Sequence, residues 1–122
     1  MKSILTNTRK PDIAFHKSGL IEITARVAKI LKVSQGDVID ILSDDEEMYL
    51  FVKHRNPIGR NAAAVYQSNK RGAHYRAWSV KLSDAILKEC KVENDVRLAV
   101  GEPLYNFEDI DIVLPIITRR IL

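Results

Sequence analysis

The chain has 122 residues, of which 46% are hydrophobic, and its formal net charge at pH 7 is +3. This length and composition predict one compact domain over residues 1–122, built on a single core. One cysteine excludes an intrachain disulfide framework, and no apolar run is long enough for a signal peptide or a membrane span, so we expect a cytoplasmic protein without membrane contact.

A strand and a helix are predicted early in the stretch Ser18–Lys53. Leu20–Ile23 places apolar residues at every second position, which is the period of a half-buried strand. Thr24 then offers a hydroxyl that can cap the unpaired amides of a following helix. Residues 25–31 carry an apolar stripe at helical spacing, with basic residues on the opposite side. The stripe consists of Val27, Ile30 and Leu31.

A turn and a hairpin follow this helix. Gln35–Asp37 contains the glycine and aspartate that are typical of turns. Ile39 and Ile41 alternate with polar residues in the next strand, and Met48–Val52 returns as the second arm. The segment between the arms, Ser43–Glu47, is acidic but lacks a calcium-loop pattern. We interpret it as a solvated hairpin tip rather than a metal site.

Residues 18–53 resemble the AbrB/SpoVT-like swapped-hairpin DNA-binding domains. The matching elements are Ser18-Gly19, the strand Ile21-x-Ile23, the helix ending in Leu31-Lys32-Val33, the turn Gln35-Gly36-Asp37 and the hairpin through Val52. Two positions depart from the family pattern: Leu20 stands where family members usually carry arginine, and Thr24 where they usually carry proline. The resemblance implies DNA binding and a barrel of strand-helix-hairpin units, which family members complete by intertwining two chains.

A diverged second copy is predicted to begin near Val80. Val80–Ser83 repeats the apolar, charged, apolar, hydroxyl order of Ile21–Thr24, which makes Ser83 the second predicted N-cap. Val92 then matches Val33. The other elements of this copy are a helix stripe at Ile86, Leu87 and Cys90, a strand through Val96, Leu98 and Val100, a long loop over Gly101–Asp109, and a strand through Ile110, Ile112 and Leu114. The alternative is chance similarity between two strand-helix-strand units.

Together with the resemblance, these units predict an α+β, mostly β fold: a small pseudo-symmetric cradle-loop or double-psi-like barrel. The first unit spans residues 13–53, a basic linker spans 54–72, and the second unit spans 73–118. A chain that holds both units can close the barrel on itself, which favours a monomer with an internal pseudo-dimer over an intertwined homo-oligomer. The expected shared core combines Ile21, Ile23, Val27, Leu31, Ile39 and Ile41 with Val80, Leu82, Ile86, Cys90, Val96 and Leu98.

Positive charge is concentrated between the two units. No acidic residue lies between Glu47 and Asp84, whereas this stretch holds seven lysines and arginines; since the whole chain carries +3, the rest carries −4. Basic side chains bind phosphates, and the interleaved aromatic rings can stack on bases, so this composition favours nucleic-acid binding. The predicted nucleic-acid-binding residues are Lys53, Arg55, Arg60, Lys70, Arg71, Tyr75, Arg76 and Trp78.

Two other interpretations of this segment stay open. A linker between repeats is expected to be polar and solvated, with Tyr75 and Trp78 packed beneath the turn at Asn56–Gly59. A basic segment can also bind an acidic protein partner. The function predicted first is a non-enzymatic nucleic-acid-binding protein of the transcription-regulator kind. The alternative is a protein-binding or assembly module that uses the barrel as a scaffold.

Catalytic and cofactor motifs are not found in the sequence. The histidines, His16, His54 and His74, show no metal-binding spacing, and one cysteine cannot form a recognisable zinc site. Cys90 falls on the apolar side of a predicted helix, which indicates a small buried hydrophobe rather than a reactive thiol. No nucleophile elbow, phosphate-binding loop or dinucleotide fingerprint is present. We therefore expect no enzyme activity, no cofactor and no bound metal.

Overall fold

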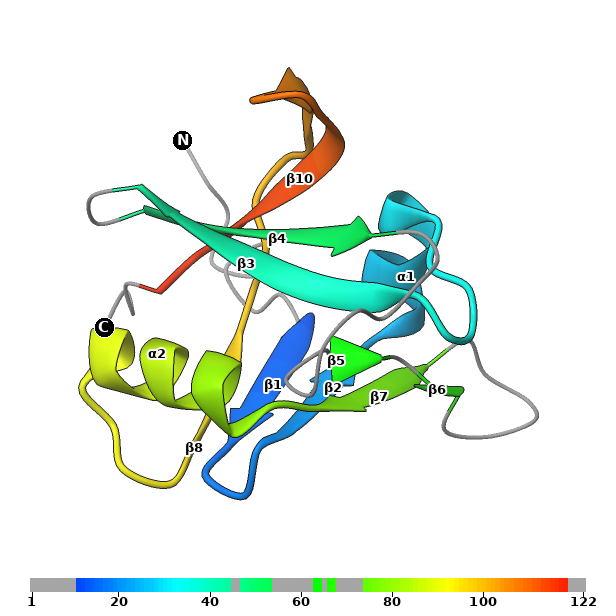
Figure 1. Ribbon diagram of the computed structural model, residues 1–122. Coiled ribbons are helices and arrows are strands. Elements are labelled where there is room, and N and C mark those ends of the chain that lie inside the picture. The colour runs from blue at the N-terminus through cyan, green and yellow to red at the C-terminus, as the bar shows by residue number, and fades with distance from the viewer. Residues whose placement is uncertain (1–10, 45–46, 54–62, 65, 68–73, 119–122) are drawn as a thin grey trace, which may run out of the picture.

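The computed structural model describes residues 11–44, 47–53, 63–64, 66–67 and 74–118 (Figure 1). Its fold is α+β and mostly β, with two helices and two antiparallel sheets among these residues. The helices are α1 (Ala25–Leu31) and α2 (Val80–Cys90). The strands are β1 (Ile13–His16), β2 (Leu20–Ile23), β3 (Val38–Asp44), β4 (Glu47–Lys53), β5 (Ala63–Ala64), β6 (Tyr66–Gln67), β7 (Tyr75–Trp78), β8 (Asp95–Leu98), β9 (Leu104–Phe107) and β10 (Ile110–Ile116). Within this described part of the chain, neither helix is long and apolar enough to cross a membrane.

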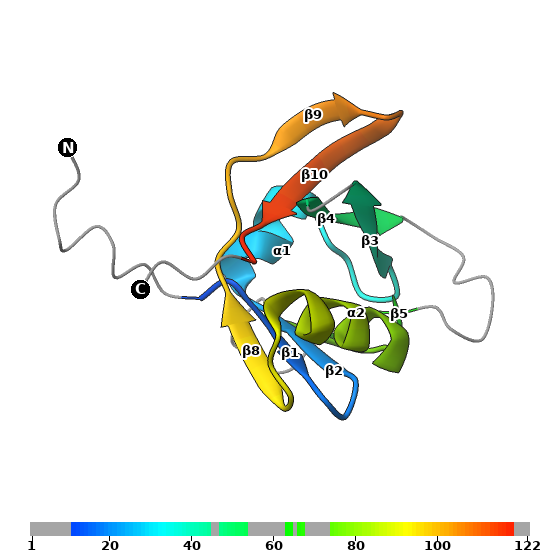
Figure 2. The same ribbon diagram turned by 90° about the vertical axis from the view of Figure 1, so that its left-hand side faces the viewer.

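Each sheet takes strands from both halves of the chain. Sheet 1 has the strand order β6-β7-β2-β1-β8, and sheet 2 has the order β5-β3-β4-β10-β9. Four strands form the body of each sheet, and the two-residue strands β5 and β6 extend one edge. β7 pairs with β2, β8 pairs with β1, and β10 pairs with β4. Sheet 2 lies above sheet 1 in Figures 1 and 2, and in Figure 1 the two helices lie at opposite sides of the molecule.

The elements predicted within residues 18–53 are confirmed. β2 buries Ile21 and Ile23 and leaves Glu22 half-exposed between them, as the alternation requires. α1 has the predicted bounds, and β3 and β4 form the predicted hairpin. β1 was not expected, although Ile13 and Phe15 show the same alternation. Its partners are β2 and the distant strand β8, so its place in the centre of sheet 1 depends on the fold of the whole chain.

One hydrophobic core joins both halves of the chain and both sheets. The predicted core residues that are buried are Ile21, Ile23, Val27, Leu31, Ile39, Ile86, Val96 and Leu98. Ile41, Leu82 and Cys90 are half-buried and pack against this cluster. Val80 was wrongly assigned to the core: it is 56% exposed, because it begins α2 rather than a strand.

α2 begins one turn earlier than predicted. Its N-cap is Ser79, whose hydroxyl accepts a hydrogen bond from the Leu82 amide at 3.1 Å. Ser83, the predicted cap, is fully buried inside the helix, and its hydroxyl donates to the carbonyl oxygen of His16. The predicted strand at Val80–Ser83 is therefore the first turn of α2, and the strand before the helix is β7.

The two helices match at their C-terminal ends. Lys32 follows α1 with a φ of 56°, and Lys91 follows α2 with a φ of 58°. In both cases the next residue, Val33 or Val92, donates its amide back into the last turn. α2 has eleven residues and α1 has seven, a difference of about one helical turn. An alignment without gaps therefore fits the ends of the helices and displaces the start of α2.

Asp12 joins the start of α1 to the chain segment that follows β8. Its buried carboxylate accepts hydrogen bonds from Arg26 Nη1 at 3.0 Å and from the Val100 amide at 3.1 Å. Thr24 occupies the N-cap position of α1, as predicted, but its hydroxyl makes no cap hydrogen bond. It donates instead to the Asp12 carbonyl oxygen at 3.1 Å. The entry to α1 is thus fixed by tertiary contacts.

A further strand occupies the predicted loop Gly101–Asp109. β9 lies within this segment and pairs with β10 through a tight turn at Glu108 and Asp109, both with positive φ. The strand pairings do not close the described strands into a barrel, because sheet 1 ends at β6 and β8 and sheet 2 ends at β5 and β9. The observed fold is thus two open sheets around one core.

Candidate nucleic-acid interface

The structure describes four of the eight residues predicted to bind nucleic acid. These are Lys53, Tyr75, Arg76 and Trp78. The other four, Arg55, Arg60, Lys70 and Arg71, lie outside the described residues. Lys53 is at the end of β4 in sheet 2, where its ammonium lies 3.2 Å from a carboxylate oxygen of Asp40. It is therefore on a different sheet from the other three.

β7 separates its predicted residues between two faces. Arg76 and Trp78 are exposed on the outer face of sheet 1, and Trp78 is 54% exposed. Tyr75 and Ala77 point the other way, and Tyr75 packs against the hydrophobic core. Two residues apart on one strand, Arg76 and Trp78 lie side by side, as the two-residue period of a strand requires. The outer face of β7 thus combines a cation with an exposed aromatic ring.

Strand register places a second arginine on the same face. Arg76 pairs with Glu22, Glu22 pairs with Ala14, and Ala14 pairs with Arg97. This row crosses the four strands β7, β2, β1 and β8, and both arginines in it are exposed. Neither guanidinium group is hydrogen-bonded or ion-paired to any described side chain. Arg97 was not predicted, because only the pairing of β8 with β1 brings it near Arg76.

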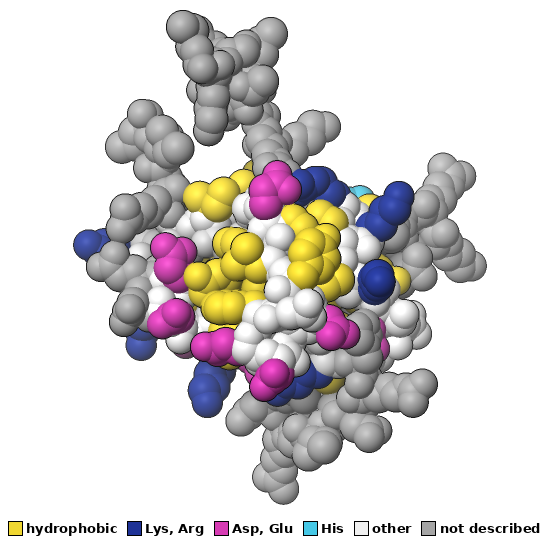
Figure 3. All heavy atoms as spheres, turned by 90° about the horizontal axis from the view of Figure 1, so that it is seen from above, with side chains coloured by type: hydrophobic (Ala, Val, Ile, Leu, Met, Phe, Trp, Pro, Cys, Tyr) yellow, Lys and Arg dark blue, Asp and Glu magenta, His cyan; other side chains and the backbone are white. Residues whose placement is uncertain are grey.

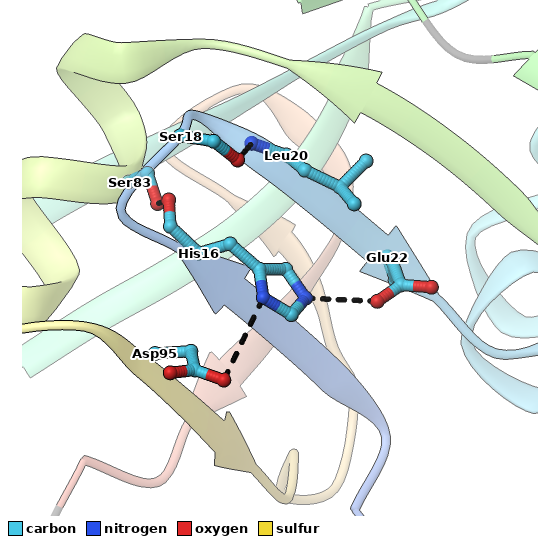
Figure 4. A network of polar contacts seen from close by, with 6 residues as sticks. All are labelled: His16, Ser18, Leu20, Glu22, Ser83 and Asp95. Atoms are coloured by element: carbon cyan, nitrogen blue, oxygen red, sulfur yellow. Dashed lines mark hydrogen bonds and ion pairs between the residues drawn. The ribbon is translucent and has the colours of Figure 1, made fainter.

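Glu22 is held in this row by His16. The His16 ring nitrogen Nε2 lies 2.8 Å from Glu22 Oε1, a distance at which the ring N–H donates to the carboxylate. The other ring nitrogen, Nδ1, lies 3.8 Å from Asp95 Oδ2. Figure 4 shows these side chains and Leu20 on the same side of the sheet. The histidine therefore fixes the carboxylate between the two arginines.

A hollow of about 470 Å³ opens at this row. Its polar lining includes Glu22, Arg76, Arg97 and His74, and its less polar walls include Pro11 and Ala14. This volume falls within the range of about 300–1,000 Å³ that is usual for small-ligand sites. Positive groups at both ends and one carboxylate between them make the hollow suited to a ligand with both anionic and hydrogen-bond-donating parts.

The face of sheet 2 has a different character. Figure 3 views the molecule from the side of this sheet, and hydrophobic side chains gather in the middle of the face, with acidic and basic side chains around them. The pKa of Tyr49 on β4 is raised above its ordinary value of 10.0 by burial first and then by three nearby carboxylates. They belong to Glu47, Asp44 and Glu108. These three carboxylates would repel a phosphate placed near Tyr49.

The residues that the structure describes contain no group of three histidine, cysteine or acidic side chains arranged to hold a metal ion. Comparisons with protein-family models, with curated proteins and with solved structures gave no match. Function is therefore inferred from the chemistry of the outer face of sheet 1.

Proposed function

We propose that this protein is a non-enzymatic nucleic-acid-binding protein of the regulator class, and that it binds through the outer face of sheet 1. One observation carries the proposal: Arg76 and Trp78 lie side by side on β7, and Arg97 shares their face with its guanidinium group unengaged by any described side chain. Arginines neutralise phosphates with release of counterions, and an exposed indole can stack on a base.

The basic linker adds to the support. Lys70 and Arg71 precede β7 closely in the sequence, and Arg55 and Arg60 follow β4. We assign these four residues to further phosphate contacts. We leave Lys53 out, because it lies on the other sheet and is paired with Asp40. Tyr75 is assigned to the core rather than to stacking.

Reversing the charge of both arginines on this face tests the proposal. The double variant Arg76→Glu, Arg97→Glu should bind labelled oligonucleotides more weakly. Its plot of log affinity against log salt concentration should be shallower by about 0.7 per lost contact on a single strand, or about 0.9 on a duplex. Fluorescence anisotropy over a range of salt concentrations measures both quantities. The milder pair Arg76→Gln, Arg97→Gln repeats the test without placing new carboxylates beside Glu22.

Lys53→Glu is the control, since it reverses a charge on sheet 2 and should leave the slope unchanged. Circular dichroism should show every variant folded. An unchanged slope in both double variants, or no binding by the parent protein at low salt, would refute the proposal.

A protein-binding module is the second candidate function. It is favoured by a group of apolar side chains at one corner of sheet 1: Trp78 is 54% exposed, Val80 is 56% exposed, and Leu20 is the cross-strand neighbour of Trp78. Such a group can seat a partner. Copurification from the native host distinguishes the two functions, because a partner protein retained after nuclease treatment supports the module and loss of all partners supports nucleic-acid binding.

We further propose that the two halves are diverged copies of one strand-helix-hairpin unit, arranged as in cradle-loop barrels such as the AbrB/SpoVT-like domains. Support comes from the matching left-handed lysines that follow α1 and α2. It comes also from the distribution of both halves over both sheets, which is the arrangement expected when two units complete one fold.

A further inference from the structure

We infer that the ligand of this face is a single strand rather than a duplex, and that Glu22 selects bases that carry an exocyclic amino group, as cytosine does. This inference rests on the proposed nucleic-acid-binding function and assigns the base that occupies the hollow beside Glu22.

The outer face of sheet 1 is too wide to enter the major groove of a duplex. Four paired strands form its body, and at about 4.8 Å per strand interval their axes span about 14 Å before side chains are added. The major groove of B-DNA is about 12 Å wide and admits a helix or a two-stranded ribbon. The bases of an unpaired strand, by contrast, can lie on an open sheet and stack on an exposed ring such as Trp78.

The charges along the row match the different parts of a nucleotide. Arg76 and Arg97 lie at the two ends of the row, separated by β2 and β1, and both line the hollow. Their positively charged guanidinium groups can bind phosphates. Glu22 lies between them and repels phosphate, so it suits a group that donates hydrogen bonds. The arrangement therefore fits a backbone that is held at its phosphates while a base enters the hollow beside Glu22.

The carboxylate of Glu22 is already held in position as a hydrogen-bond acceptor. His16 binds Oε1 at 2.8 Å, and the other carboxylate oxygen points away from the ring (Figure 4). A side chain fixed in this way loses little conformational freedom on binding. Cytosine presents an amino donor at position 4, whereas uracil presents a carbonyl oxygen there, which the carboxylate repels. The carboxylate thus discriminates between two bases of nearly equal size.

Oligodeoxycytidine and oligodeoxyuridine of twelve nucleotides test this discrimination. The intact protein should bind the cytidine strand at least about fivefold more tightly than the uridine strand, and either strand more tightly than a twelve-base-pair duplex. Glu22→Gln should weaken cytidine binding and strengthen uridine binding, because an amide can donate to the uracil carbonyl. A folding defect would weaken both. The same two sequences made as RNA show which sugar is preferred.

Glu89→Gln is the matched control, because it makes the same change on the exposed side of α2 and should leave the ratio of the two affinities unchanged. Equal binding of the two strands, an unchanged ratio in Glu22→Gln, or duplex binding as tight as single-strand binding would overturn the inference while the proposed function stands. No binding to any of these nucleic acids at low salt would overturn both.

Discussion

Two lysines hold a backbone conformation that glycine usually supplies. Lys32 and Lys91 have positive φ immediately after α1 and α2, where a left-handed residue lets the last carbonyl groups of a helix be satisfied. A side chain with a Cβ atom is strained there by roughly 1–2 kcal/mol. Both lysines are exposed, so their side chains can be removed without opening the core.

Lys91→Gly should raise the free energy of unfolding by about 0.5–1 kcal/mol, since relief of this strain exceeds the extra chain entropy that glycine brings to the unfolded state. Lys88→Gly, one turn earlier and inside α2, should lower the same quantity by about 1 kcal/mol. Urea unfolding measures both. If both substitutions lowered the free energy of unfolding, the Lys91 side chain would stabilise the fold by more than its positive φ destabilises it.

At the scale of an element, the start of α2 separates two serines with different roles. Ser79 caps the helix at a half-buried position, while Ser83 is fully buried and joins α2 to β1 through the His16 carbonyl. Because both residues are serine, the sequence alone does not distinguish these two roles. A cap tolerates any short acceptor, whereas a buried hydroxyl tolerates no charge.

Aspartate at each serine distinguishes the two roles. Ser79→Ala should lower the free energy of unfolding by about 1 kcal/mol, and Ser79→Asp should restore most of that loss. Ser83→Asp should lower it by about 3 kcal/mol or more, because a carboxylate would be buried without a cation. Thermal or urea unfolding compares the variants. If Ser83→Asp proved milder than Ser79→Ala, α2 would have to begin at Ser83 instead.

For the whole molecule, one core shared by the two halves requires them to unfold together. Leu31 is 3% exposed and belongs to the cluster that also contains Ile86, Val96 and Leu114. This cluster takes side chains from both sheets and from both helices. The two sheets should therefore behave as a single cooperative unit.

Leu31→Ala should cost about 2–5 kcal/mol by leaving a cavity in this core. Amide hydrogen exchange should show the same loss of protection in β8 of sheet 1 and in β10 of sheet 2. Ile117→Ala, at a residue that is 43% exposed, should change stability by about 0.5 kcal/mol or less. Loss of protection confined to one sheet would mean that the two sheets unfold independently.

Local periodicity determined much of this fold. The alternation of Ile21 and Ile23 with Glu22, and the stripe of Val27 and Leu31, each identify a buried face within a few residues, so β2 and α1 were predicted with correct bounds. The concentration of positive charge between Glu47 and Asp84 is likewise a property of the sequence alone. These signals are local, because each depends on neighbours along the chain.

The tertiary structure decided what depends on neighbours in space. The start of α2 could not be placed from the repeat, because α2 is about one turn longer than α1 and an alignment without gaps cannot show that additional turn. Lys53 and Arg76 belong to one basic segment but to different sheets, while Arg97, which no pattern singled out, reaches the row of Arg76 through two intervening strands. Strand pairing joins residues that are far apart in the chain, and burial of the apolar side chains of both sheets and both helices in one core selects that pairing.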